Sequence, residues 1–491
     1  MAGIVAAALA LSVLWAASRA TPSVPFAPLA LAERLVRLAP GDLATLSIEQ
    51  LGHAAIPLLT AGTVAALLGV GAAVPALVGN GSPTRYRFTA AAFFVVLLAA
   101  ALTYRLPGSS WLGLLAGSMA GAVLYCVTLE WLAELELRRD RPADPSRRAA
   151  LGWLVLAAGG LLTSGTLLGR LAARRGSAVT LAAADQTARI PARPPFPVVA
   201  DLAPEVTPPR DHYVIDIAIV DPVVVAEDWR LQLDGMVRRP LQLGADELQR
   251  RFSVVEEHSV LTCISNPVGG SLVGSSKWTG VRLRDVLAAA DPHGAATRVV
   301  FESADGYSVS VPLSTAIESP GLLAFGQGGQ PLRPEHGAPC RVRLPALYGM
   351  LNAKWLDRIH VTDGRQPGYW ARRGWSETGV VRTASRIDTR ADVLAGVPTW
   401  VAGVAWAGVR GVKRVEVSTD GGRTWADATL HPPVSPYAWT QWALRWRPPG
   451  PGDHTIFCRA TDGEGRVQDA APRPPHPSGS TGYHQVRLRA D

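Results

Sequence analysis

The chain has few side chains that bind metals: its 491 residues include only 4 cysteines and 10 histidines. The cysteines are far apart, and no two of them have the spacing of a zinc site. Iron-sulfur motifs are missing too, and His53 is the only histidine before His212, so the apolar runs offer no pair of histidines for a haem. The four cysteines are Cys126, Cys263, Cys340 and Cys458.

The sequence also lacks a concentrated basic segment. Its net charge of +8 comes from arginines scattered along the whole chain, so a nucleic acid is not expected as the main partner. A disulfide framework is not expected either, because the cysteines are isolated and Cys126 lies in an apolar run. Apolar residues are very unevenly spread over a long chain, which indicates several domains.

Apolar residues are concentrated in the first third of the chain. They form five runs, each about as long as a membrane-crossing helix, roughly 20 residues. The runs are residues 1–17, 54–78, 88–106, 111–132 and 151–168. We therefore expect residues 1–175 to be an all-α region of about five transmembrane helices in the lipid bilayer. A transporter is poorly supported, because these runs contain almost no ionisable residues.

Arginines flank these runs unevenly. They fall in the second and fourth connections, so the positive-inside rule places the amino terminus in the cytoplasm and the carboxy-terminal part outside it, across the cell membrane. Arg170, Arg174 and Arg175, just past the last run, oppose this orientation. Residues 146–151, Ser-Arg-Arg-Ala-Ala-Leu, resemble a twin-arginine export signal and fit the positive flank of a membrane helix equally well.

The rest of the sequence divides into three parts by composition. Residues 176–209 are rich in proline and are expected to form an extended tether. Residues 210–385 alternate short apolar strands with helical segments, which predicts an α+β domain. Residues 386–491 alternate strands with tight turns, which predicts a β-sandwich.

Individual elements can be predicted in both of these domains. In the α+β domain, the expected helices are 245–250 and 283–290, and the expected strands are 229–233, 260–264, 298–303, 308–311, 340–344 and 359–361. In the β-sandwich, residues 419–422, Thr-Asp-Gly-Gly, give a strong hairpin signal. The expected strands there are 412–418, 439–446, 454–460 and 483–488.

Cys263 is the candidate metal ligand. It ends an apolar strand in the segment 261–270, Leu-Thr-Cys-Ile-Ser-Asn-Pro-Val-Gly-Gly. A thiol at a strand end, before a turn that contains glycine, lies where the backbone can approach a bulky ligand closely. A thiolate gives a soft metal both a bond and a negative charge. On this segment alone, a small buried hydrophobic side chain is an equally good interpretation.

Eight short segments, which occur in the same order as in a known enzyme family, indicate a resemblance to that family. They are Tyr-Val-Ile-Asp at 213–216, Trp-Arg-Leu-Gln-Leu-Asp-Gly at 229–235, the Cys263 segment at 261–270, Trp-Thr-Gly-Val-Arg-Leu at 278–283, Asp-Gly-Tyr at 305–307, His-Gly-Ala-Pro-Cys-Arg at 336–341, Tyr-Gly at 348–349 and Lys-Trp-Leu at 354–356. From about residue 209 to its end, the chain resembles the sulfite oxidase family of molybdenum enzymes. The last strands look like that family's immunoglobulin-like dimerisation domain, which implies a possible homodimer.

The resemblance implies a molybdenum held by a single pterin, the molybdenum-molybdopterin cofactor, with Cys263 as the one protein ligand. His336 and Arg341 would then meet the pterin phosphate, and Lys354, which follows Asn352 and Ala353, would close over it. Cys340 is expected to be structural. Further positions of the family's cofactor contacts fall on Asp211, Val214, Ile215 and either Glu302 or Ser303.

The substrate side departs from the family pattern. Members that oxidise sulfite have an arginine shortly after the metal-binding cysteine, whereas residues 266–270 here are Asn-Pro-Val-Gly-Gly. Where the family places its substrate-pocket tyrosine and nearby basic residues, this chain offers another set as candidate catalytic residues: Tyr369, Arg372, Arg373 and Trp375. Sulfite is therefore in doubt, and an apolar, aromatic-lined pocket would suit a sulfoxide at least as well.

Taken together, the sequence predicts a membrane-anchored oxidoreductase that catalyses two-electron oxygen-atom transfer on a small sulfur-containing substrate outside the cytoplasm. Because the chain offers no haem or iron-sulfur ligands, we expect a separate electron-transfer protein as its partner. The alternative is a surface binding or assembly module of the same fold that has lost the cofactor. Retention of Cys263, His336, Arg341 and Lys354 argues against that alternative.

Overall fold

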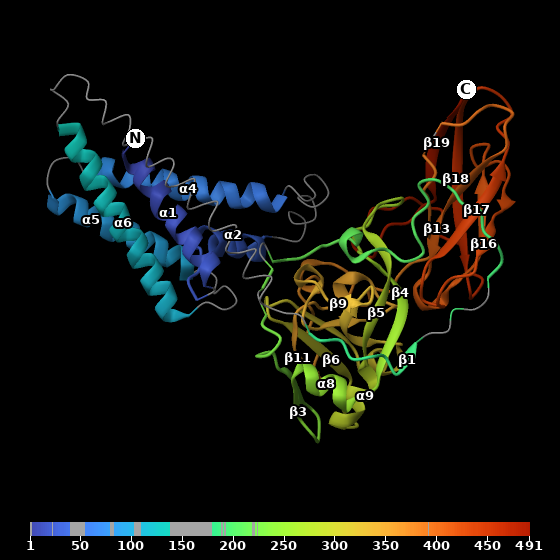
Figure 1. Cartoon of the computed structure of the whole chain (residues 1–491), viewed down its shortest axis with the longest axis horizontal. Helices are drawn as coiled ribbons and strands as arrows, with labels where there is room; N and C mark the ends of the chain where they lie inside the picture. The colour runs from blue at the N-terminus through green and yellow to red at the C-terminus, as the bar shows by residue number, and fades with distance from the viewer. Residues whose placement is uncertain are drawn as a thin grey trace. The chain divides into compact units, whose positions relative to one another are not determined.

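The computed structural model describes residues 2–21, 23–39, 55–78, 83–102, 110–137, 179–187, 190, 193–218, 221–222, 224–390 and 392–491. The chain forms two compact units, which are described separately below. The first is Met1–Ser177 with Asp216–Val223, and the second is Ala178–Ile215 with Val224–Asp491. Figure 1 traces both units from blue at the N-terminus to red at the C-terminus.

The first unit is built from apolar helices (blue to cyan in Figure 1). They are α1 (Ala2–Ala20), α2 (Ala27–Leu38), α4 (Ala55–Val78), α5 (Pro83–Leu102) and α6 (Trp111–Leu137). Among the described residues, Gly3–Ala20 and Trp111–Leu132 are long and apolar enough to cross a membrane, and the apolar stretches Leu58–Ala73 and Phe88–Leu102 are shorter. One of the two long stretches lies near the N-terminus, where a signal sequence would be apolar as well.

The helices agree with four of the five predicted runs. The fifth run, the twin-arginine segment 146–151 and Arg170, Arg174 and Arg175 lie outside the described residues. Helix α2 matches no predicted run, because three charged residues, Glu33, Arg34 and Arg37, interrupt its apolar sequence. The structure buries Glu33 and pairs it with Arg37 one turn later, at 3.6 Å.

Two mixed sheets form the first domain of the second unit. A six-stranded sheet has the order β1-β4-β5-β8-β10, with β9 paired to β8, and a five-stranded sheet has the order β3-β2-β11-β6-β7. Strands β1 and β4 are parallel, as are β2 and β11, and the other pairs are antiparallel. The strands are β1 (Gln186–Thr187), β2 (Leu231–Gly235), β3 (Leu241–Leu243), β4 (Val254–Thr262), β5 (Val273–Arg282), β6 (Arg298–Ser303), β7 (Ser308–Pro312), β8 (Leu322–Gln327), β9 (Gln330–Pro331), β10 (Arg341–Arg343) and β11 (Leu356–Thr362).

Helices α8 (Ala245–Arg251), α9 (Leu283–Ala290) and α10 (Leu313–Glu318) join these strands, which confirms the predicted α+β class. Strand β6 and helix α9 have the predicted bounds. Strand β4 begins earlier than predicted, at Val254, because its first half carries Glu256 and Glu257 and so lacks an apolar pattern. Its full length is fixed by antiparallel pairing with β5, from Val254 opposite Val281 to Thr262 opposite Val273.

The carboxy-terminal domain consists of two four-stranded antiparallel sheets. Their orders are β12-β13-β17-β16 and β15-β14-β18-β19, and apolar residues of both sheets share one core. The predicted hairpin forms between β14 and β15, and the turn places Gly421 and Gly422 at positive φ angles of 77° and 91°. The strands are β12 (Ala384–Ile387), β13 (Thr399–Trp406), β14 (Val412–Ser418), β15 (Ala426–Asp427), β16 (Thr429–His431), β17 (Thr440–Trp446), β18 (Gly452–Asp462) and β19 (His484–Ala490).

The described residues of the expected tether are part of the second unit and contact its strands and loops. Gln186 and Thr187 form β1 and pair with β4. Further along, the Thr207 backbone N–H donates to the Ser275 carbonyl at 2.6 Å, and the Ala203 N–H donates to Asp388 at 3.0 Å. The proline count alone does not indicate these contacts.

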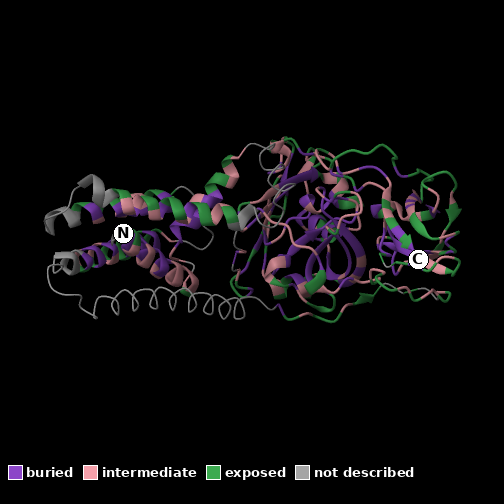
Figure 2. Ribbon diagram, turned by 90° about the horizontal axis from the view of Figure 1, so that it is seen from above, coloured by how far each residue is buried: buried purple, intermediate pink, exposed green. Residues whose placement is uncertain are grey.

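The two domains of the second unit share part of their core. Trp406 and Trp439 of the carboxy-terminal domain belong to the same buried cluster as β2, β6 and β11 of the α+β domain. Figure 2 shows the buried residues gathered along the strands of the second unit. A site between these two domains is therefore held by packed elements on both sides.

Candidate active site

Cys263 lies directly after β4, as predicted, and is buried. Its backbone N–H donates to the Leu272 carbonyl at 2.9 Å, and its Sγ lies 2.9 Å from the Ser265 hydroxyl. Burial raises the pKa of the Cys263 thiol, and the hydrogen bond from Ser265 acts in the opposite direction. The thiol is thus fixed in position and close to a group that can stabilise its thiolate.

Three buried phenols would feel the charge of this thiol: those of Tyr213, Tyr307 and Tyr348. Burial raises the pKa of each phenol, and the charge of a Cys263 thiolate would raise it further. The Tyr307 hydroxyl donates to the Met350 carbonyl at 2.6 Å, while the Tyr348 hydroxyl accepts the Arg382 backbone N–H at 3.3 Å. These hydroxyls stay protonated near neutral pH, so they can donate hydrogen bonds but do not add negative charge.

A pair of buried arginines projects from β10. Arg341 donates to the carbonyls of His336 at 2.9 Å and Asn352 at 3.2 Å. Arg343 donates to the Val260 carbonyl at 3.0 Å, and both guanidinium groups lie over the Trp278 ring, at 5.3 and 4.8 Å. Burial lowers the pKa of Arg341 to about 10 and of Arg343 to about 9. Two cations are therefore desolvated side by side.

Further basic groups gather next to these arginines. The rings of His212 and His336 are 5.7 Å apart, and His336 Nε2 lies 2.7 Å from the Pro209 carbonyl. Burial lowers the pKa of His212 to about 3 and of Lys354 to about 7. Gly337 has a φ of 102°, and a Cβ there would lie 2.8 Å from the Lys354 Cβ, so glycine is needed for this close approach.

The two buried arginines of this cluster lack a carboxylate partner within the described residues. No carboxylate pairs with Arg341 or Arg343 there, and their Nε atoms and the His212 Nε2 are buried without a hydrogen-bond partner. Buried charge is costly unless it is paired, so the cluster is suited to an anionic ligand. In the same part of the chain, no three His, Cys, Asp or Glu side chains gather as a metal site, so a metal here must bring ligands of its own.

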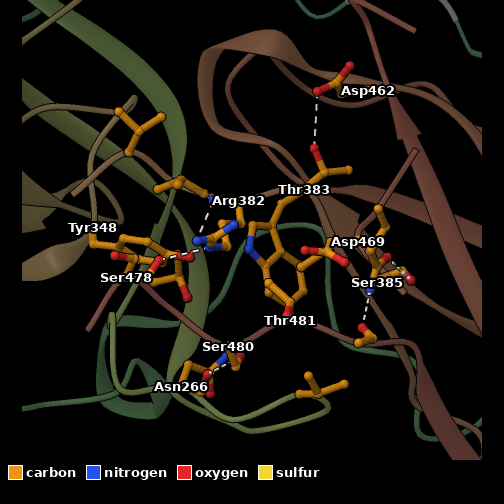
Figure 3. Close-up of a pocket in the computed structure, with 18 of the residues that line it drawn as sticks. Asn266, Tyr348, Arg382, Thr383, Ser385, Asp462, Asp469, Ser478, Ser480 and Thr481 are labelled. Atoms are coloured by element: carbon orange, nitrogen blue, oxygen red, sulfur yellow. Dashed lines mark hydrogen bonds between the residues drawn. The ribbon is translucent and has the colours of Figure 1, made fainter. Parts of the chain in front are cut away.

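Cys263 also lines a cavity of about 470 Å³ between the two domains of the second unit. The floor on the α+β side is Thr262, Cys263 and residues 266–269, and the other walls come from the segment 376–385 and the carboxy-terminal domain. Figure 3 shows Tyr348, Arg382 and Ser478 on one side of the cavity and Asp462, Asp469 and Ser385 on the other. The loop below them is held by Asn266, whose side-chain oxygen accepts the Leu272 N–H at 2.9 Å.

Comparison with known proteins identifies this arrangement. Two family models match: the oxidoreductase molybdopterin binding domain at residues 218–370 and the Mo-co oxidoreductase dimerisation domain at residues 381–475. Sulfite oxidase of Gallus gallus is 31% identical over 332 residues, which cover 57% of this chain and 72% of that protein. The chain belongs to the sulfite oxidase family. It is accordingly a molybdopterin-dependent oxidoreductase.

Two further relatives match shorter parts of the chain, and one solved structure shares its fold. The mitochondrial sulfite oxidase of Homo sapiens is 32% identical over 231 residues, 40% of this chain and 42% of that protein. Nitrate reductase [NAD(P)H] of Hordeum vulgare is 29% identical over 302 residues, 49% of this chain and 34% of that protein. The crystal structure of the sulfane dehydrogenase SoxCD from Paracoccus pantotrophus shares the fold, with a TM-score of 0.52 and 23% identity over 59% of this chain and 82% of that one.

The residues present fit the family's molybdenum cofactor. Cys263 offers one buried thiol, and Arg341, Arg343 and His212 each have a buried nitrogen without a hydrogen-bond partner that a phosphate could use. Lys354 adds a buried amino group beside them. The alternative of a cofactor-free module is set aside, because the molybdopterin-binding domain and these donors are both retained.

Most of the expected cofactor residues lie in or beside the basic cluster. His336 and Arg341 are buried in it, and the Asn352 side chain donates to the carbonyls of Leu347 and Tyr348 and so fixes the loop before Lys354. Buried Ala353 accepts the Val342 N–H at 2.9 Å. The Ser303 hydroxyl is buried without a partner.

The expected contacts at the amino-terminal edge are more exposed. Asp211 is exposed and pairs with Arg210 at 3.5 Å, and Val214 and Ile215 are half-buried. Glu302, the alternative to Ser303, pairs with Arg358 at 3.2 Å. The roles of all these residues remain predictions.

The expected substrate residues lie away from the cavity lined by Cys263. Tyr369 packs against Tyr307 at 5.7 Å between ring centroids, and Arg373 lies 3.7 Å over the Tyr369 ring. Arg372 is exposed. Trp375 is buried against His476, and its Nε1 has no hydrogen-bond partner. Within the described residues, none of these four lines the cavity, whose walls are rich in serine, threonine and arginine instead of aromatic side chains.

The structure brings three residues to the site to which the sequence motifs assign no role: Arg343, Tyr348 and Arg382. Arg343 follows Arg341 by two positions on one strand, so strand periodicity places both on the same face and could have found it. Tyr348 was a family match without an assigned role. Arg382 belongs to no sequence motif, and only the three-dimensional arrangement places it in the cavity lined by Cys263.

Proposed function

We propose that this chain is a membrane-anchored oxidoreductase that transfers an oxygen atom to or from a small sulfur-containing substrate outside the cytoplasm, in a two-electron reaction. The observation that carries the proposal is the position of Cys263. It lines the cavity between the two domains of the second unit, and the buried Arg341 and Arg343 of the same unit have no carboxylate partner among the described residues. The names of the sulfite oxidases and of the sulfane dehydrogenase favour a sulfur substrate.

The bound molybdenum cofactor would supply the two-electron oxygen-atom transfer chemistry. The chain's own residues would hold it: Cys263 would be the metal ligand, and Arg341, Arg343 and Lys354 would neutralise the pterin phosphate. Because burial raises the pKa of Cys263, ligation must release its proton, and Ser265 would then donate to the thiolate. Tyr348, whose pKa is also raised, keeps its proton and can donate it in a hydrogen bond at the edge of the cavity.

The proposed location and partners are supported by features of the first unit and of the last domain. The apolar helices α1 and α6 support anchoring in the cell membrane, and the arginine distribution favours an extracytoplasmic active site. The dimerisation domain at residues 381–475 supports a homodimer, with an immunoglobulin-like sandwich as its fold. Electrons would pass to or from a separate electron-transfer protein.

The test uses the full-length protein purified from membranes. We expect one molybdenum per chain, and turnover of sulfur oxyanions or sulfoxides with an artificial electron acceptor or donor. Protein from cells grown with tungstate in place of molybdate is the matched control and should be folded but inactive. A molybdenum-containing protein without turnover of any sulfur compound would contradict the proposed reaction, and stoichiometric haem would contradict the separate electron partner.

A further inference from the structure

The cavity lined by Cys263 contains three arginines that differ in their partners. Arg410 donates from its Nε to buried Asp462 at 2.8 Å. Arg466 pairs with Glu464 and lies 3.5 Å from Asp462. The other carboxylate of the lining, Asp469, pairs with Arg473 at 2.9 Å. The carboxylates of the cavity are thus already neutralised by arginines other than Arg382.

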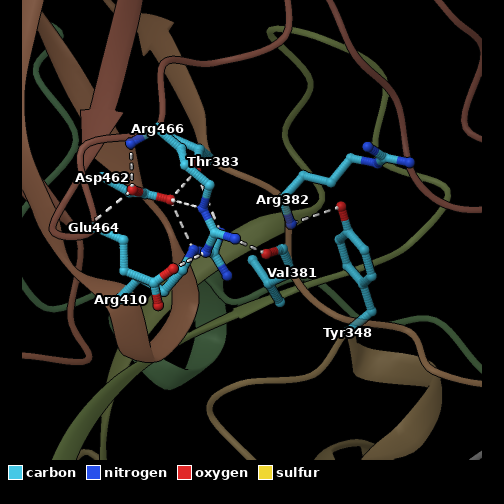
Figure 4. A network of polar contacts seen from close by, with 8 residues as sticks. All are labelled: Tyr348, Val381, Arg382, Thr383, Arg410, Asp462, Glu464 and Arg466. Atoms are coloured by element: carbon cyan, nitrogen blue, oxygen red, sulfur yellow. Dashed lines mark hydrogen bonds and ion pairs between the residues drawn. The ribbon is translucent and has the colours of Figure 1, made fainter.

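Arg382 is the third of these arginines and has no carboxylate partner within the described residues. Its Nε donates to the Ser478 carbonyl at 2.9 Å, and its backbone N–H donates to the Tyr348 hydroxyl at 3.3 Å. Figure 4 shows its side chain extending away from the cluster of Arg410, Asp462 and Arg466. The two terminal guanidinium nitrogens therefore remain for a ligand in the cavity.

We propose that Arg382 binds an anionic group of the substrate and so replaces the cation that residues 266–270 lack. This inference rests on the proposed function. The cavity places Arg382, Tyr348 and Cys263 in one lining, and the Tyr348 hydroxyl accepts the Arg382 backbone N–H at 3.3 Å. A guanidinium fork is suited to planar or tetrahedral oxyanions through paired hydrogen bonds.

The size of the cavity indicates an extended substrate. A volume of about 470 Å³ lies in the range of sites for organic ligands and far exceeds what a single small oxyanion fills. Hydroxyl groups line the space, and one of them, that of Ser480, is already used in a bond to the Asn266 carbonyl at 2.7 Å. The substrate class is therefore an organosulfur anion whose carboxylate or sulfonate lies at Arg382 while its sulfur reaches the metal held by Cys263.

The inference is tested by binding to the full-length holoenzyme, with 3-(methylsulfonyl)propanoate as the anionic probe and its neutral amide as the matched probe. Calorimetry should show the anion binding at least about tenfold more tightly than the amide. Arg382→Gln should remove this preference, and Arg382→Lys should keep part of it. The Tyr348 bond should survive both changes because it comes from the backbone.

Arg466→Gln is the matched control, because Arg466 lines the same cavity but already has carboxylate partners. It should keep the preference for the anion. Undetectable binding of the anion, equal binding of both probes by the unchanged protein, or an unchanged preference in Arg382→Gln would overturn the role of Arg382. Absence of turnover with molybdenum present would instead contradict the proposed reaction, since the binding preference does not depend on turnover.

Discussion

The two domains of the second unit hold the same residue types, cysteine and arginine, with different partners. In the carboxy-terminal domain, Arg459 makes two hydrogen bonds to Glu416, at 2.9 and 3.0 Å, and Cys458 is completely buried in the core between the sheets. In the α+β domain, Arg341 and Arg343 have no carboxylate among the described residues, and Cys263 lines a cavity.

The difference separates structure from function. Arg459 is half-buried and has its own carboxylate, whereas two desolvated arginines without one would be costly in a protein that never binds an anion. A thiol in a core cluster serves packing, whereas a thiol at a cavity wall can reach a ligand. The active site is therefore marked by arginines that lack a carboxylate partner and by a thiol at a cavity wall. The presence of cysteine and arginine alone does not mark it.

Replacing the two thiols separately should give the largest contrast. Cys263→Ser should lower turnover at least about a thousandfold, because the hydroxyl is a poor ligand for a soft metal. Cys458→Ser should leave turnover and molybdenum content unchanged and lower only thermal stability. Kinetics with an artificial electron acceptor, together with metal analysis, checks both variants. Full activity in a folded Cys263→Ser protein would rule out Cys263 as the ligand.

The arginines should give the next contrast. Arg343→Gln removes an unpaired buried cation and should weaken cofactor retention about ten- to a hundredfold. Arg459→Gln removes a cation that already has a carboxylate and should leave the cofactor in place. Pterin and molybdenum contents after dialysis measure the difference, and circular dichroism monitors the fold. Equal cofactor loss in both folded variants would contradict the claim that an arginine without a carboxylate partner marks the cofactor site.

Lys354 should make cofactor affinity in the α+β domain depend on pH. Burial lowers its pKa from the usual 10.5 to about 7 in the cofactor-free protein, so it loses its charge as the pH rises above 7. A bound phosphate favours the charged form, so binding above that pH must take up a proton. Cofactor affinity should then be constant below about pH 7 and fall by at most about tenfold per pH unit above it. Cofactor retention measured from pH 6 to 10 should fall less steeply in Lys354→Gln, and identical curves would contradict the assignment.

The sequence predicts local features of the second unit well where a pattern is repeated over several residues. Helix α9 and strand β6 have the predicted bounds, and Cys263 follows a strand as its apolar run indicates. Strand β4 was predicted too short, because Glu256 and Glu257 conceal a strand that pairing with β5 stabilises. Hydrophobic periodicity and turn motifs depend on residues close together in sequence. They carry no information about which distant strand pairs with β4.

The site itself was predictable only in part, for a related reason. The Cys263 and His336 segments are short motifs, so the sequence alone identifies them. Arg382 enters the cavity through the packing of two domains, and Trp375 turns out to be buried against His476 instead of lining that cavity. Both facts depend on contacts between residues about a hundred or more positions apart, as in the bond from Arg382 to Ser478, and no local pattern records them.

Cys340 provides the smallest expected effect and the strictest comparison, because it lies in the same domain as Cys263 and next to Arg341. It belongs to the apolar core and is 1% exposed, so its thiol packs as a small hydrophobic group. Cys340→Ala should cost about 1 kcal/mol of stability through a small cavity and leave molybdenum content unchanged. Thermal unfolding and metal analysis of the holoenzyme measure the two effects. Loss of molybdenum from this variant would mean that proximity to Arg341, and not access to the cavity, decides which thiol holds the metal.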